Sequence, residues 1–223
     1  MKVVIINGSP RARQYSNTDK IIKAFVKGLE AEGTAYELYS LSNRNEWNPA
    51  REAYLTNEKI IFALPMYVES IPSLMLEFLE TLPTDHRLTR ELSFILHGGF
   101  DEGYQFRLCE RLLKSITAQL GCSYGGCLIK GGSFMFRLFK EQQVESMTKG
   151  HINMGRMFAR NGNFMTPEAT KFTGVERYPW LVRQMLTGIL LKFIVNPKFD
   201  KFAKEWGCVT PLDVKVYSNK EAK

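Results

Sequence analysis

The first eighteen residues of the chain, MKVVIINGSPRARQYSNT, constrain its fold more than any other stretch. Val3 to Ile6 form an unbroken β-branched run, which is typical of a strand buried on both faces of a parallel sheet. Turn-forming residues follow from Asn7 to Pro10, and apolar side chains then recur at helical spacing from Ile21 to Leu29. The segment therefore predicts a buried strand, a polar loop and the start of a helix.

The polar loop carries the residue types of an anion-binding site. Its small hydroxyl and amide side chains are Ser9, Ser16, Asn17 and Thr18, and its two arginines are Arg11 and Arg13. A helix that starts here adds unpaired N–H groups and a dipole that favours negative charge. The loop fits neither the Walker nor the dinucleotide-binding glycine pattern. A simpler alternative is that Ser16 or Thr18 only caps the helix and that Arg11 and Arg13 are solvated.

Four further apolar runs predict strands, at 35–41, 59–64, 92–97 and 127–130, with helical patterns between them at about 17–32, 71–82 and 104–120. Alternating strands and helices predict an α/β fold with a parallel sheet and right-handed crossovers. The spacing fits a doubly wound five-stranded sheet in the order 2-1-3-4-5. Such sheets bind ligands outside the carboxyl ends of their strands, near the first and third strands.

The loops after the third and fourth predicted strands suit a flat heteroaromatic ligand at that edge. Pro65-Met66-Tyr67-Val68 offers a stiff backbone with polarisable and aromatic side chains, and His97-Gly98-Gly99 lets the backbone approach a ring closely. Each loop has a plainer interpretation. Tyr67 could pack on the surface of an ordinary turn, and a lone histidine at a strand end is more often structural.

These loops together resemble those of the flavodoxin-like NAD(P)H-dependent FMN reductases. Gly8-Ser9-Pro10-Arg11 followed by Ser16-Asn17-Thr18 is similar to the loop that wraps the FMN phosphate in that family, and Pro65-Met66-Tyr67 is similar to the loop that borders the isoalloxazine. The resemblance implies FMN as cofactor and NADPH or NADH as co-substrate, with no metal and no catalytic side chain. The cofactor-binding residues it implies are Ser9, Arg11, Ser16, Asn17, Thr18, Pro65, Met66, Tyr67, Val68, His97, Gly98 and Gly99.

The activity implied by the resemblance is hydride transfer from NAD(P)H through bound flavin to a small acceptor. Free flavin, quinones, azo or nitro compounds and ferric complexes are the acceptors of that family. An alternative is a flavodoxin-type electron carrier without pyridine-nucleotide activity, although such carriers are usually acidic and this chain has a formal charge of +7. A third alternative keeps the fold without flavin, as a scaffold.

The four cysteines, Cys109, Cys122, Cys127 and Cys208, have neither a C-x-x-C motif nor paired metal spacing. The related iron–sulfur flavoproteins carry a compact cysteine cluster that this chain lacks. No signal peptide is evident at the N-terminus. Reduced thiols and a cytoplasmic location are therefore expected.

The sequence divides into an expected FMN-binding domain, residues 1–132, and a helical extension, residues 133–223. The basic charge belongs mainly to the tail, because residues 171–223 hold 10 Lys and Arg against 5 Asp and Glu. No nucleic-acid motif accompanies it. Large apolar side chains recur at helical spacing across 178–206, which predicts burial in protein, with a homo-oligomer interface favoured over peripheral contact with a membrane.

Overall fold

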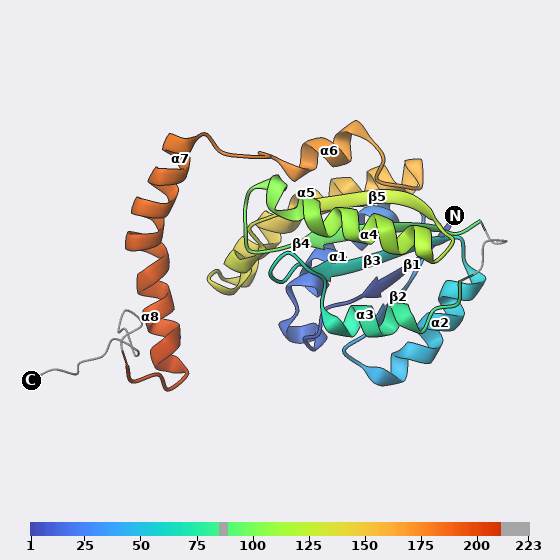
Figure 1. Cartoon of the computed structure of the whole chain (residues 1–223), viewed down its shortest axis with the longest axis horizontal. Coiled ribbons are helices and arrows are strands. Elements are labelled where there is room, and N and C mark those ends of the chain that lie inside the picture. Colours follow the sequence, from blue (N-terminus) through green and yellow to red (C-terminus); the bar gives the residue numbers. More distant parts are fainter. Residues whose placement is uncertain (85–88, 211–223) are drawn as a thin grey trace, which may run out of the picture. The chain divides into compact units, whose positions relative to one another are not determined.

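Five parallel strands form the sheet of the computed structural model, which describes residues 1–84 and 89–210 (Figure 1). The strands are β1 (Lys2–Asn7), β2 (Ala35–Ser40), β3 (Lys59–Pro65), β4 (Glu91–His97) and β5 (Ser123–Lys130). Their spatial order is β2-β1-β3-β4-β5, and each neighbouring pair is parallel. The predicted doubly wound fold and strand order are therefore confirmed.

The strands differ in burial as their sequence patterns predict. The apolar run of β1 is buried throughout from Val3 to Ile6, whereas β2, at the edge of the sheet, is mostly half-exposed. The fifth strand begins at Ser123, earlier than expected, because Gly125 and Gly126 lie inside it at an irregularity in the pairing with β4. Gly126 has a φ of 91°, which explains why glycine is found inside this strand.

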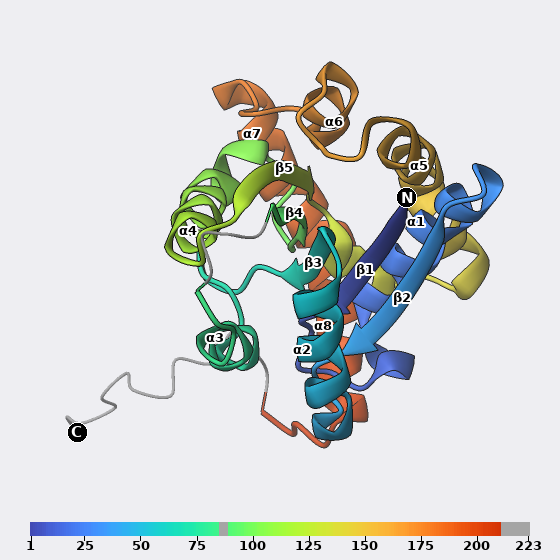
Figure 2. The ribbon, with the colours of Figure 1, turned by 90° about the vertical axis from the view of Figure 1, so that its right-hand side faces the viewer.

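Six helices cover the two faces of the sheet (Figure 2). Three of them pack on one face, namely α2 (Trp47–Thr56), α3 (Ser73–Glu80) and α4 (Arg107–Gln119). The other face is covered by α1 (Asn17–Ala31), α5 (Glu141–Asn161) and α6 (Pro167–Thr173). Short 3₁₀ segments connect several elements, at Arg13–Tyr15 (η1), Arg44–Glu46 (η2), Gly103–Phe106 (η3) and Ser133–Arg137 (η4).

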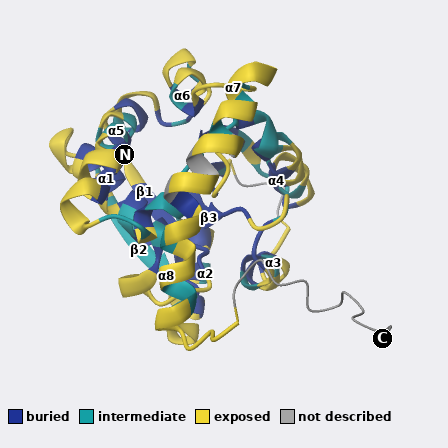
Figure 3. Ribbon diagram, turned by 90° about the vertical axis from the view of Figure 1, so that its left-hand side faces the viewer, coloured by how far each residue is buried: buried dark blue, intermediate teal, exposed yellow. Residues whose placement is uncertain are grey.

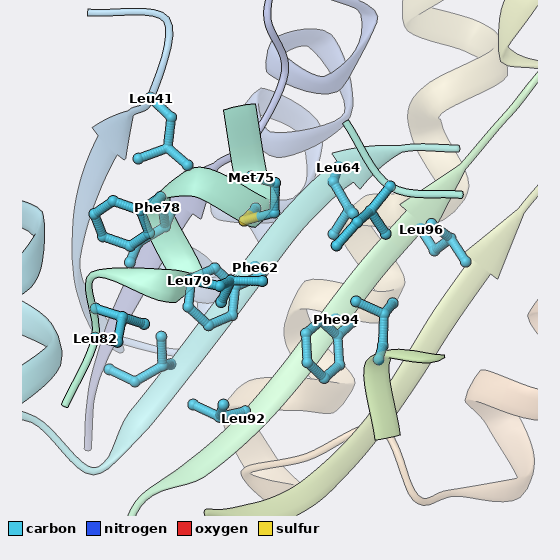
Figure 4. Packing of buried hydrophobic residues seen from close by; sticks show 14 of the residues in the cluster. Leu41, Phe62, Leu64, Met75, Phe78, Leu79, Leu82, Leu92, Phe94 and Leu96 are labelled. Atoms are coloured by element: carbon cyan, nitrogen blue, oxygen red, sulfur yellow. The ribbon is translucent and has the colours of Figure 1, made fainter. Parts of the chain in front are cut away.

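Large side chains fill the first face of the sheet. Phe62 of β3 and Phe94 of β4 stack with ring centroids 6.0 Å apart, and Met75 and Phe78 of α3 close over the strands (Figure 4). All four side chains are buried. This core holds the carboxyl ends of β3 and β4 in a fixed register. The positions at which the following loops begin are therefore fixed as well.

The second face of the sheet is closed by a very tight crossing of α1 and α5. Gly28 and Gly155 meet there, and a Cβ added at Gly155 would lie 2.0 Å from the carbonyl oxygen of Phe25. A side chain at either glycine would collide with backbone, so the crossing requires glycine. Through this contact α5 belongs to the α/β core, although the sequence boundary after residue 132 places it in the extension.

The chain divides into two units, Met1–Arg177 and Tyr178–Lys223. The described part of the second unit contains α7 (Trp180–Met185), the π-helical segment η5 (Leu186–Val195) and α8 (Asn196–Glu205). Most of its described side chains are exposed (Figure 3), including Trp180, Phe193 and Trp206. No helix in residues 1–84 and 89–210 is both long and apolar enough to cross a membrane.

Candidate functional site

A pocket of about 410 Å³ opens where the carboxyl ends of β1, β3 and β4 meet. The residues that line it are Ser9, Arg11, Asn17, Thr18, Pro65, Met66, Tyr67, His97, Gly98, Gly99, Ser133, Phe134 and Arg137. The three loops singled out in the sequence therefore converge on one pocket. Of the residues implied by the family resemblance, only Ser16 and Val68 lie outside this lining.

The N-terminus of α1 forms one wall of the pocket. Ser16 is the N-cap residue, and its buried Oγ accepts a hydrogen bond from the Asp19 N–H at 3.2 Å. This bond explains why Ser16 does not line the pocket, because its side chain turns back onto the helix. The other N–H groups at the start of α1 belong to Asn17 and Thr18, which do line it. An anion at this wall would meet the positive end of the helix dipole.

The loop after β3 is held to the end of β4. The Met66 N–H donates to the His97 carbonyl oxygen at 2.7 Å, which extends the pairing of the two strands by one residue. Beyond it, Tyr67 and Ser70 exchange backbone hydrogen bonds of 2.9 and 3.1 Å around a tight turn. The pocket side of this loop is therefore rigid at Met66 and presents Tyr67 at the edge of the tight turn.

Two residues of that turn have left-handed backbone conformations without being glycine. Val68 has a φ of 47° and Glu69 a φ of 63°. This conformation is unfavourable for a β-branched residue, and the Val68 side chain is 93% exposed, so burial does not offset the cost. The backbone hydrogen bonds between Tyr67 and Ser70 hold the turn against this cost, and Val68 shapes the loop as a central residue of the turn although it does not line the pocket.

A buried hydrogen-bond chain connects three walls of the pocket through His97. Its Nε2 lies 2.7 Å from Thr18 Oγ1, and its Nδ1 lies 2.8 Å from Ser133 Oγ. The Ser133 hydroxyl donates onward to the Gly98 carbonyl oxygen at 3.0 Å. Ser133 has one proton to give, so His97 carries its proton on Nδ1 and donates to Ser133, while Thr18 donates to Nε2.

Burial keeps this imidazole neutral. It lowers the pKa of His97 to about 3, with the charge of His151 as a second and smaller cause. A neutral ring with one donor and one acceptor is the state that the hydrogen-bond chain requires. The hydrogen bonds of both ring nitrogens favour the structural role that the sequence left as one alternative for His97. Its neighbour Thr18 has its hydroxyl proton committed to the ring, which leaves its oxygen lone pairs and its backbone N–H for a ligand.

The segment after β5 supplies a wall that the sequence analysis missed. Ser133, Phe134 and Arg137 all come from η4, which is held in place by the Asn17 side-chain amide donating to the Ser133 carbonyl oxygen at 2.8 Å. No motif marks this stretch. The signal that could have found it is positional, because it follows a strand end at the same edge of the sheet.

Gly98 and Gly99 are closely packed against neighbouring phenylalanine side chains. A Cβ at Gly98 would lie 2.9 Å from a ring carbon of the buried Phe106, and one at Gly99 would lie 3.4 Å from Phe134. The loop after β4 consequently brings bare backbone to the pocket, as expected of a site that receives a flat ring.

Sheet order and pocket position together define a flavodoxin-like α/β protein. Residues 1–91 match the sequence profile of the family described as "Flavodoxin-like fold". No curated protein matches the chain significantly in sequence.

Solved structures share the fold at low sequence identity. An FMN-dependent NADH-azoreductase from Bacillus anthracis, in complex with FMN, is 15% identical, with a TM-score of 0.52 over 71% of this chain and 100% of that one. An NADH:FMN oxidoreductase in its apo form is 18% identical, with a TM-score of 0.53 over 78% and 95%. An NAD(P)H:quinone oxidoreductase from Methanothermobacter marburgensis is 15% identical, with a TM-score of 0.57 over 72% and 95%. The descriptions of these structures agree with the resemblance drawn from the loops.

Proposed function

We propose that this protein is an FMN-dependent oxidoreductase that uses NADPH or NADH to reduce a small acceptor. The observation that carries the proposal is the pocket itself. Three loops far apart in the sequence, each of which resembles a flavin-binding loop, line one cavity at the carboxyl edge of the sheet. Its volume of about 410 Å³ lies within the usual range of cofactor sites, ~300–1,000 Å³.

The lining has the chemistry that FMN requires. The start of α1 and the Arg11 guanidinium provide positive potential for a phosphate. Pro65, Met66 and Phe134 provide apolar surface for a flat ring, beside the bare backbone of Gly98. Bound FMN would supply the redox chemistry, taking a hydride from the nicotinamide and passing electrons to the acceptor.

The protein's own contribution is binding and orientation. The hydrogen-bond chain through His97 fixes Thr18, Ser133 and Gly98 relative to one another. The start of α1, which we call the phosphate wall, and the loop after β4, which we call the ring wall, therefore form one rigid unit. Rigid donors placed before the ligand arrives lower the cost of binding and of stabilising charge on it. Because His97 is held neutral, it acts as a positioning residue.

A flavin titration tests the proposal directly. Adding FMN to apo-protein should quench flavin fluorescence and raise the melting temperature by mass action. The FMN-loaded protein should then oxidise NADPH or NADH in the presence of a quinone or free flavin. Absence of both quenching and thermal shift would refute the FMN site. FMN binding without any NAD(P)H oxidation would favour the electron-carrier alternative.

We also propose that the second unit mediates self-association. Its exposed apolar side chains include Trp180, Leu181, Met185, Ile189 and Phe193. A set of this size in water is costly and is typical of an interaction surface. All four cysteines are free thiols, which fits the cytoplasmic location that we propose.

The self-association proposal is tested in the full-length chain. Light scattering should give a dimer or larger species for the wild type and a smaller species for a variant with Leu181, Ile189 and Phe193 replaced by Ser. A variant with Lys201 and Lys204 replaced by Ala is the matched control, because it removes charge and keeps the apolar face. A monomeric wild type that sediments with anionic vesicles, and loses this in the lysine variant, would favour the membrane alternative.

A further inference from the structure

Arg137 is the charged residue of the pocket that the loop motifs do not account for. It is the last residue of η4 and lines the same cavity as Arg11, which comes from the loop after β1. Both are exposed at the pocket. The pocket therefore receives one guanidinium from each of two segments that lie far apart in the sequence.

Neither guanidinium has a carboxylate partner among the described residues. Other arginines of the α/β unit do form ion pairs. Arg13 pairs with Glu46 at 2.8 Å, and Arg44 with Glu77 at 2.6 Å. The described lining of the pocket contains no Asp or Glu. Arg11 and Arg137 thus differ from Arg13 and Arg44, because they line the pocket and form no ion pair with a described carboxylate.

The backbone that carries Arg137 is fixed beside the start of α1. The Ser133 N–H donates to the Gly98 carbonyl oxygen at 2.9 Å, and the Ser133 carbonyl oxygen accepts from the Asn17 side chain at 2.8 Å. The first residue of η4 is therefore tied to both the ring wall and the phosphate wall. Arg137 follows it within a single short 3₁₀ segment.

The two guanidiniums are close enough to repel each other. The pKa of Arg137 is lowered, first by burial and then by the positive charge of Arg11. An anion bound between these two like charges, beside a helix N-terminus, would relieve their repulsion. An anion with two charges matches this arrangement better than one with a single charge.

We propose that Arg11 and Arg137 jointly bind the dianionic terminal phosphate of FMN, which makes Arg137 a selectivity residue for the monophosphate. The inference rests on the proposed function. It explains why FMN would be preferred over riboflavin, which has no phosphate, and over FAD, whose two phosphates carry one charge each. A guanidinium can give a phosphate two parallel hydrogen bonds, which an ammonium cannot.

The test is a set of binding titrations with FMN, riboflavin and FAD, followed by flavin fluorescence. Arg137→Ala should raise the Kd for FMN at least about tenfold and change the Kd for riboflavin less than about twofold. Arg137→Lys should recover part of the FMN affinity. Arg111→Ala, an exposed arginine of α4 outside the pocket, is the matched control and should change neither Kd.

The same titrations give the outcomes that overturn the inference. Equal loss of FMN and riboflavin affinity in Arg137→Ala would mean that Arg137 supports the pocket's shape only. If Arg137→Ala leaves the FMN affinity unchanged and raises the KM for NADPH but not for NADH, Arg137 binds the additional phosphate of NADPH and not the phosphate of FMN. Wild-type protein that binds no flavin would overturn the proposed function as well, so the two failures are distinguishable.

Discussion

The large apolar side chains of the two units differ in their exposure to solvent. In the α/β unit, Phe62, Phe94 and Phe106 are almost completely buried between helices and strands. In the helical unit, Trp180, Phe193 and Trp206 are 71%, 67% and 80% exposed. Apolar content alone therefore does not identify a core. What differs is the packing partner, because helices cover both faces of a sheet in the first unit, whereas the described part of the second unit contains no sheet for its helices to pack on.

The largest expected contrast is between buried and exposed phenylalanines. Phe62→Ala removes a stacked, fully buried ring and should lower the free energy of unfolding by about 3–5 kcal/mol. Phe193→Ala should leave unfolding of the α/β unit unchanged within ~0.5 kcal/mol and act on self-association instead. Urea denaturation of both variants measures the difference. Equal destabilisation would mean that Phe193 belongs to the same cooperative core.

The next contrast compares two glycines. Gly155→Ala places a methyl group 2.0 Å from the Phe25 carbonyl oxygen and should cost about 3 kcal/mol, because backbone must shift. Gly188 has open space around its Cβ position, so Gly188→Ala should instead favour its helix by ~0.5–1 kcal/mol. Thermal melts and helical circular dichroism check both. A neutral Gly155→Ala would contradict the tight α1–α5 crossing.

The loss of stability that histidines cause between pH 7 and pH 5 should arise in the α/β unit, because residues 178–223 contain no histidine. In the α/β unit, burial lowers the pKa of His97 to about 3 and that of His151 to about 4. Both rings stay neutral when folded but take up a proton near pH 6.5 when unfolded, so stability is lost as pH falls below 6.5. Each ring should cost on the order of 2 kcal/mol between pH 7 and pH 5.

Denaturation at a series of pH values measures this loss of stability. The variant His151→Phe separates the contribution of His151 from that of His97. The variant removes the ring whose Nε2 is buried without a partner in the described residues. The free energy of unfolding of this variant should depend less strongly on pH than that of the wild type, and the remaining dependence should come from His97. A stability curve that does not change between pH 7 and pH 5 would show that the rings are solvated.

The smallest expected contrast concerns helix caps. Ser16→Ala removes the N-cap bond of α1 and should cost about 1 kcal/mol of stability. The N-cap residue of α7, Pro179, makes no such bond, so Pro179→Ala should change stability less. The FMN affinity should fall less in Ser16→Ala than in Arg11→Ala, since Ser16 does not line the pocket. A larger fall in Ser16→Ala would place its hydroxyl on the phosphate.

Much of the fold could be predicted from sequence because it depends on local pattern. The apolar run from Val3 to Ile6, the turn after it and the start of α1 at Asn17 all follow from residues next to one another. The strand order then follows from general rules for parallel sheets. Once that order is known, the loops after β1, β3 and β4 must meet at one edge.

The η4 wall could not be predicted because its position depends on distant partners. Ser133 is held by Asn17, His97 and Gly98, none of which is near it in sequence. The α1–α5 crossing is similar, since Gly28 and Gly155 have no recognisable pattern until the two helices meet. Nothing in the sequence of α5 indicates which element it packs against.

The α1–α5 crossing also determines the order in which a newly made chain is completed. Ribosomes release the N-terminus first, so α1 emerges long before α5 does. Until residues beyond Gly155 have left the ribosome, the surface of α1 around Gly28 has no helix to cover it. The sheet itself can assemble once β5 has emerged at Lys130. We therefore expect the nascent protein to pass through a stage in which the sheet has formed and its second face is covered by α1 without α5.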